Sequence, residues 1–189
     1  MQGKQIWQDF APYRKIEAPK NNPQKAAVAL HIKLLSDDIK IILIERSIYN
    51  GKHSQQIAFP GGKMELTDSS LEITARRESH EEIGFGLNEG ILLGCLSEIF
   101  IPVSSFLVKP FVFLHDQFPN FNKNEREVNT IFNCRLSEID TIKKRSYKDI
   151  KISRNQVLKN VPGVHYKGHF IWGATALMLH EFNTALKSS

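Results

Sequence analysis

Apolar residues in this chain gather in short runs that polar or turn-forming residues separate. Two runs, Ala26–Leu35 and Ile39–Ile44, flank the polar break Ser36-Asp37-Asp38, and this pattern predicts a β-hairpin. Pro110 lies within another run and cannot donate a hydrogen bond to a neighbouring strand, so we expect that strand at a sheet edge or with a bulge. The remaining runs predict strands at Ile57–Phe59, Ile91–Ile101, Phe106–Leu114, Val128–Phe132 and His165–Ile171.

The clearest helical segment runs from Asp68 to Ile83. Asp68, Ser69 and Ser70 are residue types that cap the start of a helix. Gly84 follows at a position where a left-handed residue commonly ends one. The sequence therefore predicts a helix of about four turns between a polar cap and a glycine stop.

Two further helices are expected, a short one at Ser137–Lys144 and a last one at Thr175–Leu186. The apolar face of the last helix consists of Ala176, Leu179 and Phe182. Strands and helices in this order predict an α/β fold with a mixed sheet, the Asp68 helix on one side and the last helix on the other. We expect one domain at 26–189, after a polar lead-in at 1–25.

Three carboxylates stand near the end of the Asp68 helix. Glu81 and Glu82 follow Glu78 by three and four positions, so all three lie on one face within about one turn. Acids at a helix C-terminus are disfavoured by the macrodipole, and like charges at this spacing repel. A divalent cation with a preference for oxygen ligands removes both penalties. The spacing favours a metal site over a solvated acidic face.

Composition and charge limit the class of protein. With 189 residues, 41% hydrophobic and 24% charged, the chain is typical of one globular domain. No apolar run approaches the roughly 20 residues that span a bilayer, and the first ten residues lack the order of a signal peptide, so we expect a cytoplasmic location. Cys95 and Cys134 are far apart and are expected as buried thiols.

A net charge of +5 is compatible with a polyanionic partner. The densest basic stretch, from Lys143 to Arg154, contains Tyr147 as its one aromatic residue, so we interpret it as a solvated loop. We expect a small polyanionic substrate and neither a nucleic acid nor a membrane as partner; the oligomeric state stays open.

The segment from Phe59 to Phe85 resembles the signature of the Nudix hydrolases, G-x5-E-x7-R-E-U-x-E-E-x-G-U, where U is apolar. Arg77-Glu78, Glu81-Glu82 and Gly84-Phe85 match its second half in register. Ser79 departs from the pattern by occupying the first apolar position. One extra residue also separates Gly62 from Arg77, so that Asp68 takes the place of the first glutamate.

The upstream flank resembles the coenzyme A diphosphatases within that family. Their R-S and H-S-G-Q elements before F-P-G-G correspond to Arg46-Ser47, His53–Gln56 and Phe59–Gly62. Gln55 stands where the subfamily has glycine, and we expect it to narrow or change the choice of substrate. Two later segments, Ile101–Val112 and Trp172–Ala176, are also similar.

The resemblance implies an αβα sandwich and hydrolysis of coenzyme A or acyl-coenzyme A to 3′,5′-ADP and (acyl-)4′-phosphopantetheine. It implies Mg²⁺ or Mn²⁺ at Glu78, Glu81, Glu82 and the carbonyl group of Gly62. We expect Glu78 to be the general base, Arg77 to orient Glu78 through a charge-assisted pair, and Glu82 to take part in catalysis. The substrate-binding residues implied are Arg46, Ser47, His53 and Gln56.

Alternatives remain open at this point. Glu98 and Glu127 are possible helper carboxylates, and the alternative for each is a surface acid, which we favour for Glu98. Gln55 leaves ADP-ribose, a dinucleotide or another nucleoside diphosphate derivative as the alternative substrate. A binding module without hydrolytic activity is disfavoured by the intact Arg77, Glu78, Glu81 and Glu82.

Overall fold

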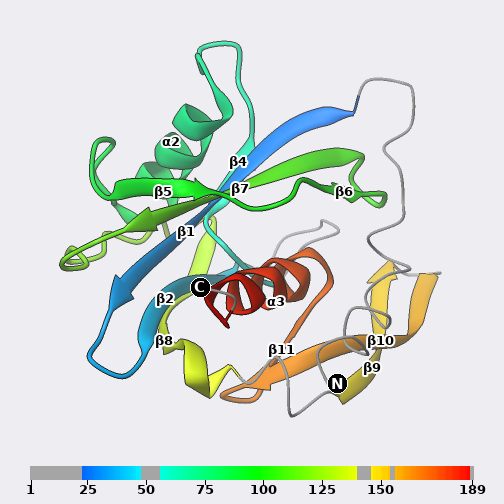
Figure 1. Cartoon of the computed structure of the whole chain (residues 1–189). Coiled ribbons are helices and arrows are strands. Elements are labelled where there is room, and N and C mark those ends of the chain that lie inside the picture. The colour runs from blue at the N-terminus through cyan, green and yellow to red at the C-terminus, as the bar shows by residue number, and fades with distance from the viewer. Residues whose placement is uncertain (1–22, 48–55, 140–145, 154–155, 188–189) are drawn as a thin grey trace.

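Two helices cover the main β-sheet from opposite sides. The structure, a computed structural model, describes residues 23–47, 56–139, 146–153 and 156–187. Figure 1 shows α2 (Leu71–Ile83) over one face of the sheet and α3 (Gly173–Lys187) over the other. The expected α/β sandwich is confirmed. Among these residues, no helix is long and apolar enough to cross a membrane.

The main sheet has eight strands, and its central hydrogen-bonded order is β3-β2-β1-β7-β5. In addition, β4 pairs with β1, β6 with β7 and β8 with β2. The pair of β1 and β7 is parallel while the other pairs are antiparallel, so the sheet is mixed as expected. The strands are β1 (Gln24–Leu34), β2 (Ile39–Arg46), β3 (Ile57–Ala58), β4 (Gly61–Lys63), β5 (Ile91–Cys95), β6 (Ile99–Ile101), β7 (Phe106–Leu114) and β8 (Val128–Arg135).

The central strands bury side chains on both faces, which explains their nearly continuous apolar sequences. In β2, Ile42 and Ile44 share a cluster with Ile83 of α2. Leu43 points to the other side and belongs to the larger core that contains Leu179 of α3. The expected buried face of α3 is confirmed, since Ala176, Leu179 and Phe182 are all buried. The first strand begins at Gln24, two residues before the boundary expected at Ala26, and residues 1–22 lie outside the described part of the chain.

A second sheet of three strands was not expected. It consists of β9 (Ser146–Ser153), β10 (Gln156–Tyr166) and β11 (His169–Trp172), in the order β11-β10-β9. The predicted loop over the basic stretch is therefore wrong in its described part. The predicted single strand at His165–Ile171 is also wrong, because Lys167 and Gly168 both have positive φ, 46° and 85°. Two such residues form a tight hairpin turn that reverses the chain.

The predicted strand Ile91–Ile101 is interrupted, and this interruption explains the place of Pro110. The strand β5 ends at Cys95, β6 begins at Ile99, and both pair with β7. Pro110 is thus in the interior of the sheet, and the expected edge position is wrong. The Leu96 N–H, between β5 and β6, donates to the Pro110 carbonyl at 2.9 Å. Because the nitrogen and the carbonyl of one strand residue point to the same side, the proline nitrogen also faces this gap between β5 and β6. The missing N–H falls where the neighbouring ladder is already interrupted.

The predicted helix at Ser137–Lys144 is a single 3₁₀ turn, η1 (Leu136–Glu138), as far as the described residues reach. Ser137 does not cap it, since its Oγ donates to Asp38 Oδ2 at 2.6 Å. This contact ties η1 to the loop between β1 and β2. Residues 140–145 lie outside the described part of the chain.

The helix predicted from Asp68, α2, begins three residues later than expected. Ser70 is the N-cap, with extended backbone, and its Oγ accepts a hydrogen bond from the Ile73 N–H at 3.2 Å. Gly84 ends the helix at φ 81°, the left-handed conformation expected of it. The last turn, which carries Glu78, Glu81 and Glu82, is fixed by this cap.

Replacing the cap tests this assignment. We expect Ser70→Ala to lower the free energy of unfolding by about 1 kcal/mol, because it leaves the Ile73 N–H without its acceptor. Ser69→Ala is the matched control, since Ser69 is an exposed neighbour outside the helix, and it should stay within about 0.5 kcal/mol of the wild type. Urea unfolding measures both, and equal losses for the two variants would contradict the assignment.

Candidate active site

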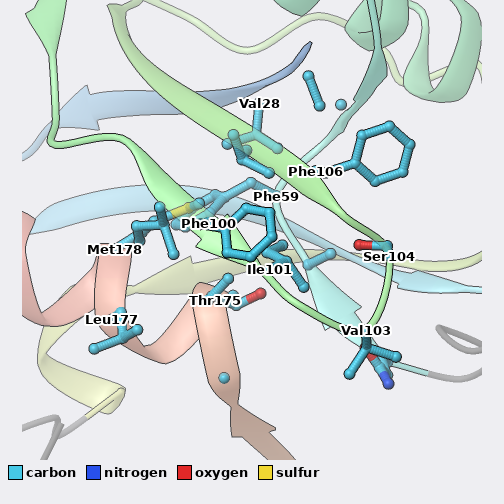
Figure 2. Close-up of a pocket in the computed structure, with 18 of the residues that line it drawn as sticks. Val28, Phe59, Phe100, Ile101, Val103, Ser104, Phe106, Thr175, Leu177 and Met178 are labelled. Carbon is cyan, nitrogen blue, oxygen red and sulfur yellow. The ribbon is translucent and has the colours of Figure 1, made fainter. Parts of the chain in front are cut away.

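A cavity of about 410 Å³ opens beside Phe59–Gly62, the glycine turn, whose last two residues begin β4. Figure 2 shows side chains from the sheet, from the β6–β7 turn and from the first turns of α3 around it. Arg46, Gln56, Gly61, Gly62 and Lys63 line it at the end that meets the turn. A concave, mostly apolar site with a few polar groups is the usual form of a small-molecule site.

Gly62 lies against the carboxylate of Glu78. A Cβ atom at position 62 would be 2.5 Å from Cδ and both carboxylate oxygens of Glu78, which is far inside contact distance. Glycine is therefore required here for the backbone to reach the helix. The structure brings together Gly62 and Glu78, two of the four predicted metal ligands.

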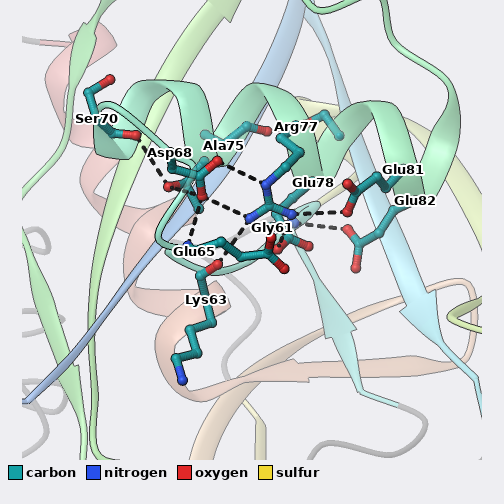
Figure 3. Close-up of polar contacts among 12 residues, drawn as sticks. Gly61, Lys63, Glu65, Asp68, Ser70, Ala75, Arg77, Glu78, Glu81 and Glu82 are labelled. Atoms are coloured by element: carbon teal, nitrogen blue, oxygen red, sulfur yellow. Dashed lines mark hydrogen bonds and ion pairs between the residues drawn. The ribbon is translucent and has the colours of Figure 1, made fainter.

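Arg77 holds this arrangement in place (Figure 3). Its Nε and Nη2 donate to the two oxygens of Asp68 at 2.9 and 3.0 Å. Nη1 donates to Glu78 Oε1 and Glu81 Oε2, both at 3.0 Å, and Nη2 also reaches the Lys63 carbonyl at 3.1 Å. A guanidinium has five N–H donors, so these five contacts match its capacity. Arg77 thus contacts Glu78 as expected, while its role in catalysis stays a prediction.

Asp68 serves as the buried anchor for Arg77. Besides the two contacts with Arg77, its Oδ2 accepts from the Thr74 hydroxyl and the Glu65 N–H, both at 2.9 Å. The Arg77 hydrogen bond is the largest influence on the carboxyl and lowers the pKa of Asp68 to about 2, against the opposing effect of burial. Asp68, the acid that replaces the first glutamate of the signature, therefore serves to hold Arg77 in position.

Glu82 is buried under the glycine turn, with a residue exposure of 1%. Its Oε2 accepts from the Gly61 N–H at 2.9 Å, and its Oε1 lies 3.6 Å from Arg46 Nη2. Burial raises the pKa of Glu82 to about 7, although Arg46 and the Gly61 N–H act in the opposite direction. Arg46 also donates to the Gly61 carbonyl at 2.7 Å, so it joins the turn to the helix.

The three predicted metal-binding acids differ in their surroundings. Glu78 is partly buried, and burial raises its pKa in spite of Arg77. Glu81 is half exposed and meets Arg77. Among the described residues, no three acidic, histidine or cysteine side chains are already gathered as a metal site. The donors nevertheless fit Mg²⁺ or Mn²⁺, because all are hard oxygen ligands and the Gly62 backbone lies directly against Glu78.

The predicted substrate-binding residues do not all meet at the cavity. Arg46 and Gln56 line it. Ser47 does not, since its N–H donates to the Glu127 carbonyl at 2.9 Å and its Oγ donates to the Glu125 carbonyl at 3.3 Å. Ser47 thus helps to hold the loop before β8. His53 and Gln55 lie outside the described residues.

Of the two possible helper carboxylates, Glu98 and Glu127, one lies near the site. The negative charge of Glu127 contributes to the raised pKa of Glu82. Glu98 is instead exposed and lies 3.9 Å from Lys109 in a loose ion pair. The structure therefore retains Glu127 as a nearby acid and gives Glu98 a surface contact.

A buried polar network behind α2 was missed in the sequence. Ser79 donates to the Ala75 carbonyl at 2.8 Å, and its Oγ is 2.9 Å from His31 Nε2. His31 Nδ1 is 2.8 Å from His115 Nε2, and His31 stacks on Phe85 at 3.8 Å. Ser79 departs from the apolar pattern because it is a partner for a buried histidine. The one signal in the sequence was a histidine inside the apolar run of β1.

The anchoring role of Asp68 gives a pH-dependent prediction. The pKa of Asp68 is lowered from 3.8 to about 2, so its ionised form stabilises the fold by about 2 kcal/mol above pH 4. This contribution is lost as the pH falls through about 2. We expect Asp68→Asn to be less stable than the wild type at pH 7 in urea unfolding, with the charge-dependent part of the difference reduced to about half at pH 3.

Asp37→Asn is the control for this experiment, because Asp37 is exposed and lies 3.9 Å from Arg135 in a surface pair. It should change stability by less than about 0.5 kcal/mol at either pH. If the stability difference between Asp68→Asn and the wild type is the same at pH 7 and pH 3, the stabilisation by the contact of Asp68 with Arg77 does not depend on the charge of Asp68.

Comparison with known proteins gives the family of the chain. Residues 24–159 match the family model described as the NUDIX domain. A protein named "Uncharacterized Nudix hydrolase NudL" from Pectobacterium atrosepticum is 34% identical over 163 residues, which cover 86% of this chain and 83% of that protein. A protein of the same name from Yersinia enterocolitica is 35% identical over 160 residues, with 85% and 80% covered.

Solved structures show the same fold. The binary complex of the C. elegans Ap4A hydrolase has a TM-score of 0.60 at 16% identity and covers 88% of this chain and 99% of that one. A MutT/nudix family protein from Enterococcus faecalis has a TM-score of 0.58 at 14% identity, with 94% and 68% covered. The chain therefore belongs to the Nudix family, whose hydrolases use divalent metal ions to cleave nucleoside diphosphate derivatives.

Proposed function

We propose that this Nudix hydrolase cleaves the pyrophosphate linkage of coenzyme A or an acyl-coenzyme A, releasing 3′,5′-ADP and (acyl-)4′-phosphopantetheine. The observation that carries the proposal is that Glu78 lies against Gly62 while Glu82 contacts Gly61 and Arg46. These three partners line one end of a mostly apolar cavity. Such a site offers oxygen donors for a cation and a guanidinium for phosphate beside room for an uncharged arm. The flank that resembles the coenzyme A diphosphatases supports this substrate.

The metal ligands proposed are the carboxylates of Glu78, Glu81 and Glu82 with the Gly62 carbonyl. A bound Mg²⁺ or Mn²⁺ supplies charge neutralisation at the phosphates and lowers the pKa of a bound water. The protein itself contributes the placement of these donors, since Arg77 fixes Glu78 and Glu81 while the Gly61 N–H fixes Glu82.

Glu78 is our choice for the general base. Arg77 Nη1 binds its Oε1, which fixes the orientation of the carboxylate and leaves Oε2 to accept a proton from the attacking water. Burial raises the pKa of Glu78, which brings it closer to the neutral pH at which a base works best.

Arg46 is our choice for the contact with substrate phosphate. Its side chain is 29% exposed, it lines the cavity, and it lies 3.6 Å from Glu82. A guanidinium held by a carboxylate on one side keeps donors for a phosphate on the other. Lys63 at the same end adds a second positive charge.

The second candidate keeps the reaction and changes the substrate to ADP-ribose or another nucleoside diphosphate derivative. Gln55 favours it, because it replaces the glycine of the coenzyme A diphosphatase pattern. The Nudix domain of Shewanella oneidensis NrtR, whose solved structure contains ADP ribose, shares the fold with a TM-score of 0.50 at 18% identity.

A product analysis separates the two substrates. Incubation with coenzyme A and Mg²⁺ or Mn²⁺, with ADP-ribose in a parallel reaction, should release 3′,5′-ADP from coenzyme A and leave ADP-ribose largely intact. Chromatography with mass detection identifies the products. Cleavage of ADP-ribose without cleavage of coenzyme A would replace the proposed substrate with the second candidate.

Loss of one carboxylate tests the chemistry. We expect Glu82→Gln to lower kcat by at least about a hundredfold, because it removes a charge from the proposed metal site, while the circular dichroism spectrum stays that of the wild type. Glu65→Gln is the control, since Glu65 is an exposed acid of the preceding loop, and it should keep wild-type activity. A Glu82→Gln enzyme with wild-type kcat would remove Glu82 from the metal site.

A further inference from the structure

The apolar part of the cavity has no part in the chemistry proposed above. Its volume of about 410 Å³ lies within the range of sites for small molecules. Its walls come from segments far apart in the sequence, and Figure 2 shows their side chains around one hollow. The wall residues that matter here are Phe59 after β3, Phe100 and Ile101 of β6, Phe106 of β7, and Leu177 and Met178 of α3.

Charge is confined to one end of this cavity. Among the described residues that line it, Arg46 and Lys63 are the charged ones, and both accompany the glycine turn. The opposite end, between β6 and α3, consists mostly of apolar side chains. A ligand that matches this polarity has a polyanionic group at the end lined by Arg46 and Lys63 and a long uncharged group extending toward α3.

The hydroxyl group of Ser104 is a polar group in the apolar part of the cavity. Its Oγ is buried and has no hydrogen-bond partner among the described residues. It lines the cavity from the turn between β6 and β7 (Figure 2). Buried hydroxyl groups are normally paired, and an unpaired one costs free energy, so this hydroxyl is suited to donate to a carbonyl oxygen of a ligand.

These features distinguish between the two halves of a coenzyme A thioester. The nucleotide half carries a 3′-phosphate and an adenine with several hydrogen-bonding edges, which an apolar wall leaves unpaired. The other half is a flexible chain of methylene groups with carbonyl groups along it, and it ends in the acyl group. Apolar walls with one hydroxyl group that lacks a partner among the described residues fit the second half.

We propose that the cavity binds the acyl-pantetheine half of an acyl-coenzyme A, with Ser104 donating to an amide or thioester carbonyl and the acyl chain packed between β6 and α3. The nucleotide half then lies outside the cavity. This proposal rests on the proposed function, which places the pyrophosphate at the charged end of the cavity. It adds the orientation of the substrate and a preference for acylated over free coenzyme A.

Binding measured without turnover tests the orientation. In EDTA, calorimetry gives Kd for free coenzyme A and for its acetyl, butyryl, hexanoyl and octanoyl thioesters. We expect Kd to fall by up to about fourfold for each buried methylene until the chain fills the cavity, in line with the free energy of burying one such group. A Kd that does not change with chain length would overturn the proposal.

Two variants test whether the dependence of Kd on chain length arises in this cavity. The ligand 3′,5′-ADP serves as the probe for the nucleotide half. Ala174→Phe narrows the cavity at the start of α3 and should bring the Kd of octanoyl-coenzyme A close to that of free coenzyme A. Ala185→Phe is the matched control, because it places the same substitution on an exposed part of the same helix. Both variants should bind 3′,5′-ADP as the wild type does. Weaker binding of 3′,5′-ADP to Ala174→Phe alone would place the nucleotide in the cavity and contradict the proposal.

Ser104→Ala gives a second test that does not depend on the folding of Ala174→Phe. It removes a buried hydroxyl group without a partner among the described residues, so it should not lower the melting temperature. It should raise the Kd of octanoyl-coenzyme A several-fold and leave that of 3′,5′-ADP unchanged. An unchanged Kd for both ligands would remove Ser104 from the site.

Hydrolysis measured separately distinguishes this inference from the proposed function. If the wild type binds longer acyl chains more tightly but cleaves no coenzyme A derivative with Mg²⁺ or Mn²⁺, the orientation holds and the proposed reaction fails. If it cleaves free coenzyme A while Kd is independent of chain length, the reaction holds and the orientation fails.

Discussion

The active site depends on the contacts of Arg77. One guanidinium joins the Lys63 carbonyl at the end of β4 and Asp68 of the following loop to Glu78 and Glu81 of α2. Lysine offers a single charged nitrogen and cannot reproduce this planar set of donors. Because Arg77 fixes the loop on the helix, the glycine turn can lie against Glu78 without an intervening side chain. Two of the proposed metal ligands, Glu78 and Glu81, are positioned by this interaction before any cation binds.

The proposed chemistry depends on the acids that lie around Arg77. Three carboxylates at the C-terminal end of α2 oppose the helix dipole and repel one another. Arg77 and Arg46 offset only part of this, since the pKa values of Glu78 and Glu82 remain raised. Placing Glu82 under the turn thus costs stability, which a divalent cation bound at the proposed site would restore. Function and stability are opposed at this site, as they often are in enzymes.

Local patterns in the sequence identified the parts of the structure that depend on neighbouring residues. The β1–β2 hairpin, the stop at Gly84 and the buried face of α3 each follow from a few adjacent positions. The pair of Arg77 with Glu78 was expected, but its stronger link to Asp68 was not, because a contact across nine residues has no periodic signal. The cavity was missed for the same reason, since its walls come from β3, β6, β7 and α3. The second sheet was missed because the basic residues of β9 hid its strand pattern.

The central claim is that the acids of α2 and the glycine turn together hold a divalent cation. The most direct measurement is anomalous diffraction from crystals of the protein grown with Mn²⁺. We predict one strong anomalous peak within coordination distance of carboxylate oxygens of Glu78 and Glu82 and of the Gly62 carbonyl oxygen. A Mn²⁺ peak elsewhere in the molecule, with Gly62 not among the ligands, would contradict the claim.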